Sequence, residues 1–296
     1  MSTLHVCLLG LGEVGRVLAE DLRPQVAALT AWDIEFPREA SRPREAAARL
    51  GIAVTRDVRE AASNADVVIS AVTAGQCIAA AQAAAPYLKP GAWYFDLNSV
   101  SPGTRLEACD RVRSAQARYV EAAVMSPIHP KRLASPMLLG GGDAEQFLGV
   151  AQPLGFSGAQ FFSGKLGAAS AAKMCRSVIV KGMEALFLES LMSARHFGVE
   201  DVVLESLRGW LGRRDEDIFA RYLLERTLLH GRRRAEEMRE VARSVREAGL
   251  DPRMSEACAS WQDWAGGRIP AVQDRHAQVT LAGLLDELRA ANEVAG

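Results

Sequence analysis

The sequence predicts an α/β protein in which a doubly wound parallel sheet is followed by an all-α C-terminal domain. Three observations support this fold class. Short apolar segments alternate with helical patterns through the first half of the chain, a glycine-rich turn follows the first apolar segment, and strand patterns largely stop after Gly164. Strands that alternate with helices form right-handed βαβ units, and these units build a parallel sheet with helices on both faces.

The first half of the chain contains the expected strands and the helices that connect them. The expected strands are residues 6–9, 28–32, 66–72, 93–97, 118–123 and 137–140. The expected helices are residues 15–23, 44–50, 76–85 and 104–117. Each strand is a short apolar run, and each helix has apolar residues at a spacing near 3.6.

Helical patterns dominate the rest of the chain. They cover residues 167–197, 202–210, 215–229, 232–248, 254–265 and 277–291. This change of pattern places the domain boundary near residue 164, which gives an N-terminal domain of residues 1–164 and a helical domain of residues 165–296.

The composition indicates a globular protein that binds a small molecule. The 296 residues suffice for two domains, and 49% hydrophobic with 24% charged residues is typical of globular chains. A net charge of -1 argues against nucleic acid or an anionic membrane as partner. Apolar runs stay well below the ~18 residues of a membrane span, and the N-terminus does not resemble a signal peptide, so a cytoplasmic location is expected.

The reactive residue types are sparse. Five cysteines lie far apart without a CxxC pair, so we expect neither a disulfide framework nor a metal site. No HExxH motif, Cys/His cluster or Ser-His-Asp order is present, which disfavours hydrolase and metal chemistry. The 35 basic residues include only five lysines, and lysine, unlike arginine, can lose its proton in a protein.

The glycine-rich turn predicts a dinucleotide site of the Rossmann type. The motif is Gly10-Leu11-Gly12-Glu13-Val14-Gly15, between the first strand and the first helix. Its first glycine makes the tight turn, its second lets the backbone approach a pyrophosphate, and its third lets helix and strand pack closely. The helix N-terminus then faces the phosphates with its unpaired N–H groups.

An acidic residue follows at the distance that this site requires. Asp33 lies 18 residues after Gly15, at the end of the second strand, where a carboxylate can accept hydrogen bonds from a ribose diol. This favours NAD, although Arg38, Arg42 and Arg44 follow nearby and leave NADP possible. Val72 and Thr73 end the next strand and are expected to touch the cofactor. A turn without a ligand, with Asp33 as a turn residue, is the alternative.

Four segments, in this order, carry a resemblance to a known family. They are Gly10–Gly15, Asp96–Pro102, Glu121–Pro127 and Gly167–Lys173. The chain resembles the β-hydroxyacid dehydrogenase family, which includes 6-phosphogluconate and 3-hydroxyisobutyrate dehydrogenases, and more closely its 6-phosphogluconate dehydrogenase NAD-binding-like branch. The resemblance implies an NAD(P)-dependent oxidoreductase that interconverts an alcohol and a carbonyl on a small, anionic substrate. It also implies a homodimer in which the helical domains pack together.

The resemblance also assigns roles to individual residues. It makes Lys173 the general acid in carbonyl reduction and the general base in alcohol oxidation. The substrate contacts that it implies, or that the strand edge and helix spacing suggest, are Asn98, Ser99, Met125, Ser126, Ser177 and Lys181. Lys173, Ser177 and Lys181 share one helix face at a spacing of four residues. For Asn98 and Ser99 the alternative is a cap on the helix near Pro102, and for Ser177 it is a bond to its own helix.

Several positions depart from the family pattern. Met125-Ser126-Pro127 stands where the family has Ser-Gly-Gly, Ser177 stands where it has Asn, and Glu236 stands where it has a lysine of the helical domain. These departures suggest an altered substrate. An imine-reductase-like protein, whose branch lacks the lysine, and a non-catalytic dinucleotide sensor are the alternatives. His129 and His230 are further candidates to reach the cleft.

Overall fold

The computed structural model describes residues 2–208, 216–247, 249–266, 280, 283, 285–287 and 290. The chain divides into two compact units, Met1–Val178 and Ile179–Gly296. This division falls inside the long helix α7 (Ala168–Phe197), whereas the domain boundary predicted near residue 164 follows strand β7 (Ala159–Ser163). That boundary stays a prediction. Lys173 and the glycine-rich turn belong to the same unit.

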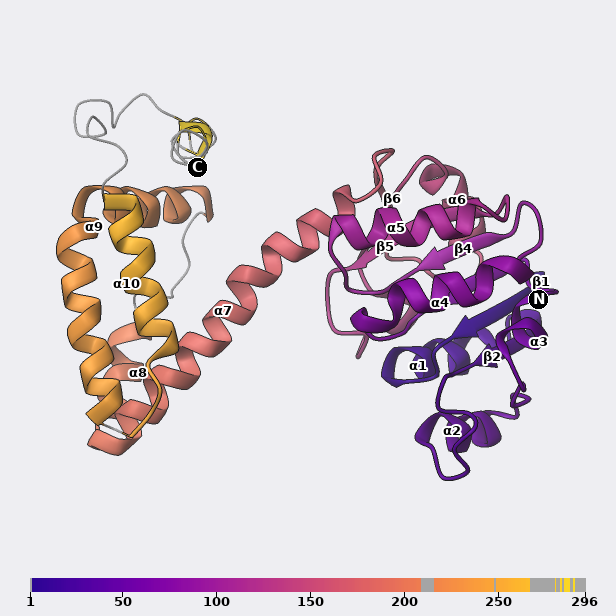
Figure 1. Cartoon of the computed structure of the whole chain (residues 1–296), viewed down its shortest axis with the longest axis horizontal. Helices are drawn as coiled ribbons and strands as arrows, with labels where there is room; N and C mark the ends of the chain where they lie inside the picture. Colours follow the sequence, from indigo (N-terminus) through magenta and orange to yellow (C-terminus); the bar gives the residue numbers. More distant parts are fainter. Residues whose placement is uncertain are drawn as a thin grey trace. The chain divides into compact units, whose positions relative to one another are not determined.

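The first unit is built on a seven-stranded sheet, which confirms the predicted fold class (Figure 1). Besides β7, the sheet contains β1 (Ser2–Leu9), β2 (Val26–Trp32), β3 (Val67–Ser70), β4 (Trp93–Asp96), β5 (Arg118–Val124) and β6 (Met137–Gly140). The strand order is β2-β1-β3-β4-β5-β6-β7. The β1 strand pairs in parallel with both β2 and β3, so the chain reverses its direction of winding beside the glycine-rich turn.

One strand pair departs from the predicted parallel sheet. Strands β5 and β6 are antiparallel, with Glu121 opposite Gly140. The connection between them contains only a 3₁₀ turn, Arg132–Ala134, and no crossover helix. Parallel neighbours are usually joined by a crossover helix, and this connection, which has none, returns the chain in the opposite direction.

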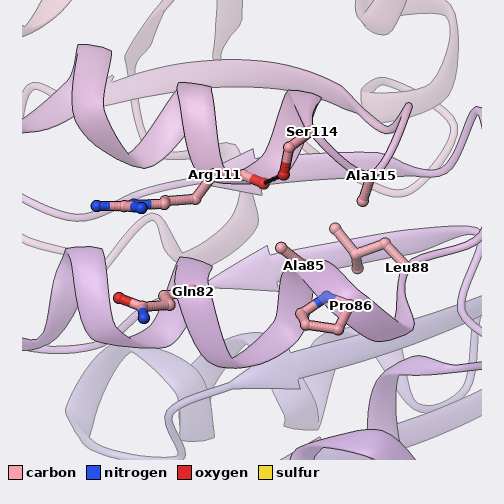
Figure 2. Close-up of a pocket in the computed structure, with 7 residues that line it drawn as sticks. All are labelled: Gln82, Ala85, Pro86, Leu88, Arg111, Ser114 and Ala115. Atoms are coloured by element: carbon pink, nitrogen blue, oxygen red, sulfur yellow. Dashed lines mark hydrogen bonds between the residues drawn. The ribbon is translucent and has the colours of Figure 1, made fainter.

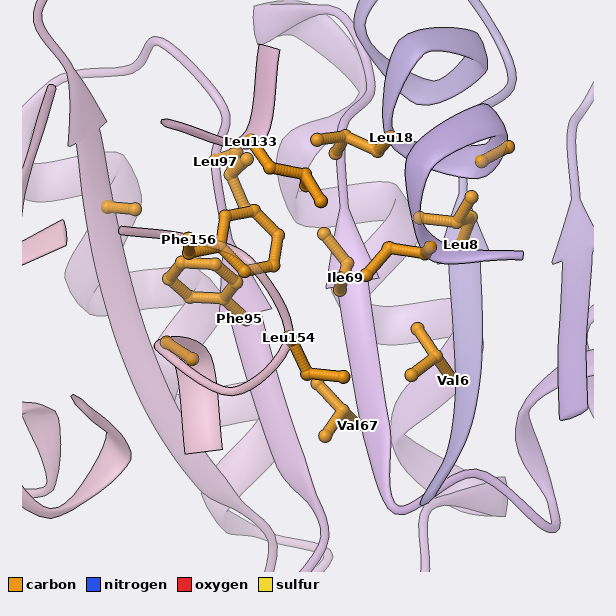
Figure 3. Close-up of a cluster of buried hydrophobic side chains, with 14 of the residues drawn as sticks. Val6, Leu8, Leu18, Val67, Ile69, Phe95, Leu97, Leu133, Leu154 and Phe156 are labelled. Carbon is orange, nitrogen blue, oxygen red and sulfur yellow. The ribbon is translucent and has the colours of Figure 1, made fainter. Parts of the chain in front are cut away.

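Helices cover both faces of the sheet, and side chains alternate between the two faces along each strand. The covering helices are α1 (Glu13–Leu22), α2 (Arg42–Leu50), α3 (Val58–Ala62), α4 (Cys77–Ala84), α5 (Pro102–Arg113) and α6 (Ala144–Ala151). Val6 and Leu8 of β1 join the core under α1, α2 and α6, which is the cluster in Figure 3, whereas Cys7 and Leu9 join the core under α3, α4 and α5. This alternation gives a three-layer domain.

The second unit contains α8 (Glu200–Arg208), α9 (Glu216–Glu247) and α10 (Arg253–Gly266). The two helices predicted over residues 215–229 and 232–248 are one continuous helix, so that prediction is wrong. The helix continues through Gly231, where a Cβ atom would lie 2.8 Å from the Cα atom of Gly266. This glycine serves close packing of α9 against α10. Of the helix predicted over residues 277–291, the structure describes residues 280, 283, 285–287 and 290, and all of these except residue 280 are helical.

Short elements were not predicted. Helices α3 and α6 contain five and eight residues, so each offers at most about two turns of a helical pattern. Strand β7 is an edge strand on which Gln160, Phe161 and Phe162 are all exposed, so its sequence does not alternate.

A buried carboxylate anchors the N-terminus of α7 to the sheet. Glu121 of β5 is fully buried, and its Oε1 atom accepts hydrogen bonds from the N–H groups of Gly167 (2.7 Å) and Ala169 (3.3 Å). Its Oε2 atom accepts from the N–H (3.3 Å) and the hydroxyl (2.7 Å) of Ser170. A negative charge at a helix N-terminus satisfies N–H groups that have no partner within the helix and interacts favourably with the helix dipole. The position of α7 on the sheet therefore depends on Glu121.

We predict that Glu121→Gln destabilises the first unit by about 3 kcal/mol, because the neutral amide turns an NH₂ group toward donors and leaves the buried Arg105 with less compensation. Glu107→Gln, which alters an exposed pair with Arg111, should cost less than about 0.5 kcal/mol. Urea unfolding followed by circular dichroism measures both midpoints. Equal midpoints for the two variants would show that the buried carboxylate does not anchor α7.

Candidate functional site

The glycine-rich turn has the backbone geometry that a dinucleotide site requires. Gly10 has φ of +91°, and a Cβ atom on it would lie 2.6 Å from the carbonyl oxygen of Ala71. A Cβ atom on Gly15 would collide with the carbonyl oxygen of Gly10. Only glycine fits at these two positions, because the first needs the left-handed region and the second needs close contact between helix and turn.

Gly12 differs from its neighbours because it faces open space. A Cβ atom on Gly12 would meet no atom within 4 Å, and this residue is the N-cap of α1 without a side chain that could cap the helix. The first N–H groups of α1 therefore point toward accessible space rather than toward a capping side chain. This arrangement fits a pyrophosphate on the helix N-terminus.

Asp33 ties the glycine-rich turn to the end of β2. Its Oδ2 atom accepts a hydrogen bond from the N–H of Leu11 (2.7 Å), and its Oδ1 atom accepts one from the N–H of Glu35 (2.9 Å). The side chain is buried, yet it lines the pocket beside the turn. Each carboxylate oxygen keeps a second lone pair, so Asp33 can still accept a hydrogen bond from a ligand hydroxyl.

These elements enclose a pocket of about 780 Å³ at the carboxyl edge of the sheet. Of the residues predicted to contact the cofactor, it is lined by Gly10, Gly12, Glu13, Val14, Asp33, Val72 and Thr73. Leu11 and Gly15 are buried behind it. Because the pocket combines the open helix N-terminus with a carboxylate at the end of β2, its residues fit a dinucleotide.

The pocket also contains residues that the sequence did not single out. They are Trp32, Ile34, Glu35, Pro43, Ala71, Gln76, Ala79, Ala80 and Ala83. The alanine-rich sequence of α4 was a signal for part of this set. Ala79 and Ala83 lie one turn apart on the same helix face, where small side chains leave room for a ligand. Ile34 is 60% exposed, which is unusual for isoleucine beside such a pocket.

Asn98 connects the pocket to the neighbouring strand. Its Oδ1 atom accepts a hydrogen bond from the N–H of Val72 (2.8 Å), and its Nδ2 atom donates to the hydroxyl of Ser70 (2.9 Å). The side chain is only 2% exposed. Its amide thus holds the end of β3, and its role as a donor to substrate stays a prediction.

Ser99 and Lys173 form a direct contact at the same edge of the sheet. The ammonium Nζ atom of Lys173, on α7, donates a hydrogen bond of 2.7 Å to the hydroxyl of Ser99, which follows β4. Ser99 is exposed and Lys173 is half-buried. The helix near Pro102 is capped instead by Ser101, whose hydroxyl accepts from the N–H of Thr104. A capping role for Ser99 is therefore not needed.

The loop after β5 has few free donors. The N–H of Met125 donates to the carbonyl of Pro136 (2.8 Å), and the hydroxyl of Ser126 donates to the carbonyl of Pro127 (3.0 Å). Pro127 has no N–H group. Met125 and Ser126 are both half-buried at the end of β5, and their contact with substrate stays a prediction.

The remaining candidates lie on elements farther along the chain. Ser177 is half-buried on α7, and the side chain of Lys181 lies outside the described ones. His129 is exposed in the loop after β5, and His230 is exposed on α9 of the second unit. Their contribution to the site stays a prediction.

A second hollow, of about 470 Å³, lies between the C-terminal parts of α4 and α5 (Figure 2). Gln82 and Leu88 line it on one side, and Arg111 and Ser114 line it on the other. The hydroxyl of Ser114 donates to the carbonyl of Arg111, which completes the end of α5. None of the predicted site residues lines this hollow.

No described helix is long and apolar enough to cross a membrane. Among the same residues, no group of three or more His, Cys, Asp and Glu side chains is arranged to hold a metal ion.

Comparisons with known proteins agree with this geometry. The family model of the NAD binding domain of 6-phosphogluconate dehydrogenase matches residues 5–165, and a domain of unknown function matches residues 194–265. A probable 3-hydroxyisobutyrate dehydrogenase of Mycobacterium tuberculosis is 27% identical over 200 residues, which cover 66% of this chain and 65% of that protein.

Solved structures extend the similarity over nearly the whole chain. A conserved hypothetical protein from Sinorhizobium meliloti is 33% identical with a TM-score of 0.58, over 98% of this chain and 97% of that one. An imine reductase from Myxococcus stipitatus in complex with NADP⁺ has a TM-score of 0.71 over 96% of this chain and 99% of that one, but at 19% identity it shows the fold alone. The chain thus belongs to the family of NAD(P)-dependent oxidoreductases that share the NAD binding domain of 6-phosphogluconate dehydrogenase.

Proposed function

We propose that the protein is an NAD(H)-dependent oxidoreductase that interconverts an alcohol and a carbonyl on a small, anionic substrate. The observation that carries this proposal is the hydrogen bond between Lys173 Nζ and Ser99 Oγ, at the edge of the sheet that also bears the glycine-rich pocket. Ligands of doubly wound sheets bind at this edge, beyond the carboxyl ends of the strands. A bound nicotinamide would supply or accept the hydride.

Lys173 would move the hydroxyl proton. Its ammonium group can donate a proton to the carbonyl oxygen during reduction, and its neutral amine can take the proton of the alcohol during oxidation. Ser99 fixes the position of Nζ and offers a hydroxyl to the same substrate oxygen. An exposed serine beside a half-buried lysine provides both a donor and a proton-transfer group at one point.

The acidic end of β2 supports NAD as the cofactor. Asp33 and Glu35 both line the pocket, and their carboxylates would repel the 2′-phosphate of NADP. The Arg38 guanidinium forms an ion pair with the Glu35 carboxylate on the surface, so these two charges partly compensate each other. The buried carboxylate of Asp33 therefore dominates the choice of cofactor.

We further propose a homodimer in the cytoplasm. The five cysteines are free, which is consistent with a reducing compartment. Ile179, Met183 and Leu186 on α7 are exposed at helical spacing, and this apolar stripe supports packing against a second copy.

Lys173→Ala is expected to lower kcat by about 10³-fold, because general acid–base catalysis contributes 10²- to 10⁴-fold. The dissociation constant of NADH should stay within about twofold, since Lys173 does not line the dinucleotide pocket. NADH fluorescence titration and oxidation of a panel of 3-hydroxyacids, followed at the nicotinamide absorbance band, measure the two quantities. The matched control is Lys165→Ala, an exposed lysine that precedes α7.

The outcomes separate the proposal from its alternatives. Full activity of Lys173→Ala would remove the catalytic role of Lys173, and turnover of cyclic imines instead of hydroxyacids would identify an imine reductase. Binding of NADH without turnover of any substrate would favour a dinucleotide sensor.

Asp33→Asn is expected to reduce the preference for NADH over NADPH by about tenfold, which corresponds to ~1.4 kcal/mol. The asparagine removes the negative charge that repels a 2′-phosphate. It keeps one oxygen that can accept the Leu11 N–H, while its NH₂ group faces the Glu35 N–H. Titration with both nucleotides measures the ratio of dissociation constants. Asp57→Asn, at the exposed N-cap of α3, should leave this ratio unchanged, and an unchanged ratio for Asp33→Asn as well would contradict the assignment.

The wild-type protein should sediment near 64 kDa, about twice its chain mass of 31.9 kDa. Replacing Ile179 and Met183 together by Glu should give a monomer, because two charges then interrupt the apolar stripe. Leu106→Glu, at an exposed leucine of α5, is the control that should stay dimeric. A wild-type protein that sediments as a monomer at micromolar concentration would refute the dimer.

A further inference from the structure

We propose that Arg105 is a positioning residue that sets the distance between Ser99 and Lys173. This inference rests on the proposed function, in which these two side chains handle the substrate oxygen. Arg105 lies on α5 and is 1% exposed, so it is shielded from solvent and acts through its neighbours. Its guanidinium group spans from the segment that carries Ser99 to the helix that carries Lys173.

On one side, Arg105 holds the segment after β4. Its Nη1 atom donates to the carbonyl of Asp96 (3.0 Å) and forms an ion pair with the Asp96 carboxylate (2.5 Å). Its Nη2 atom donates to the carbonyl of Asn98, the residue immediately before Ser99. The hydroxyl of Tyr119 donates to the same Asp96 carboxylate (2.5 Å), so the acceptor itself is held in place.

On the other side, Arg105 holds the first turn of α7. Its Nε atom donates to the hydroxyl of Ser170 (2.9 Å), which in turn donates to the Glu121 carboxylate (2.7 Å). Ser170 lies three residues before Lys173, on the same side of the helix. A shift of Ser170 therefore moves the lysine with it.

The planar guanidinium suits this role better than other cations. Its five N–H donors have a fixed geometry, so the donors that face β4 and the donor that faces α7 keep a constant separation. A flexible lysine ammonium at position 105 would offer a point charge and no such fork. The arginine thus keeps a fixed distance between the segment after β4 and the first turn of α7. We call Arg105, with its contacts to Asp96, Asn98 and Ser170, the brace.

Ser170→Ala tests the brace more cleanly than a change of Arg105, whose loss would leave buried acids unpaired. The alanine breaks the contact between Arg105 and α7 while the Gly167 and Ala169 N–H groups still bind Glu121. We expect kcat with the fastest 3-hydroxyacid of the panel to fall about tenfold, with the KM and the dissociation constant of NADH within about twofold. Ser63→Ala, whose hydroxyl bonds only the Arg59 carbonyl, is the control.

A double-mutant cycle distinguishes positioning from general stability. If Arg105 acts through the Ser99–Lys173 pair, Ser170→Ala should have little further effect on kcat in a Ser99→Ala background. A merely structural role predicts that the two effects multiply. Multiplication of the two effects would therefore overturn the proposal.

Trace acetylation of the lysines gives a readout that needs no substrate. The reaction rate of an amine depends on its free-base fraction and on access to it, so loosening the Lys173–Ser99 contact should change the rate at Lys173 by about threefold or more. Lys165 and Lys89 serve as internal standards whose rates should stay the same in Ser170→Ala.

The two proposals can fail separately. A wild-type acetylation rate at Lys173 in Ser170→Ala, together with an unchanged kcat, refutes the brace while Lys173→Ala still tests the catalytic assignment. If Lys173→Ala keeps full activity, the proposed function fails, and the acetylation rate alone then decides whether Arg105 positions Lys173.

Discussion

The first unit depends on one buried carboxylate. Glu121 sits under the start of α7 and accepts four hydrogen bonds from the first turn of that helix. A buried charge is costly unless it is compensated, and here the helix N-terminus and Arg105, 3.8 Å away, compensate it. This desolvation cost fixes the position of α7 on the sheet, because a shift of the helix would leave the Glu121 carboxylate without its hydrogen-bond donors. The helix that carries Lys173 is thereby placed relative to the strand edge.

The same network reaches the dinucleotide pocket. The side chain of Asn98 accepts a hydrogen bond from the Val72 N–H, and its carbonyl accepts one from the Arg105 guanidinium. This residue therefore connects the pocket wall to Arg105. Polar groups that are fully satisfied in a buried network specify a single arrangement more strictly than apolar packing does. We therefore expect the pocket and the Ser99–Lys173 contact to keep one relative geometry within this unit.

The fold class could be predicted from the sequence, and most of the predicted cofactor residues line the pocket, whereas the contacts of Arg105 could not be predicted. The motif Gly10–Gly15 and the acid Asp33 lie at spacings that a local backbone turn requires, and such requirements can be read along the chain. Arg105 has no comparable signal, because its partners come from β4, β5 and α7 and meet only in three dimensions. The break predicted between residues 229 and 232 is wrong for the same reason, since Gly231 packs against Gly266, which is 35 residues away. Sequence motifs therefore predict turns and helix starts, whereas the buried polar contacts of Arg105 depend on which strands and helices the fold brings together.

The loop after β5 shows how a departure from a family pattern becomes a physical constraint. Its Met125 N–H and Ser126 hydroxyl are bonded within the protein, and Pro127 has no N–H to offer. An anion that took the Met125 N–H or the Ser126 hydroxyl would displace an existing hydrogen bond, so its net gain there would be small. In the proposed function, polar recognition of a substrate then falls to Ser99 and Lys173, the two residues whose separation we propose that the buried network sets.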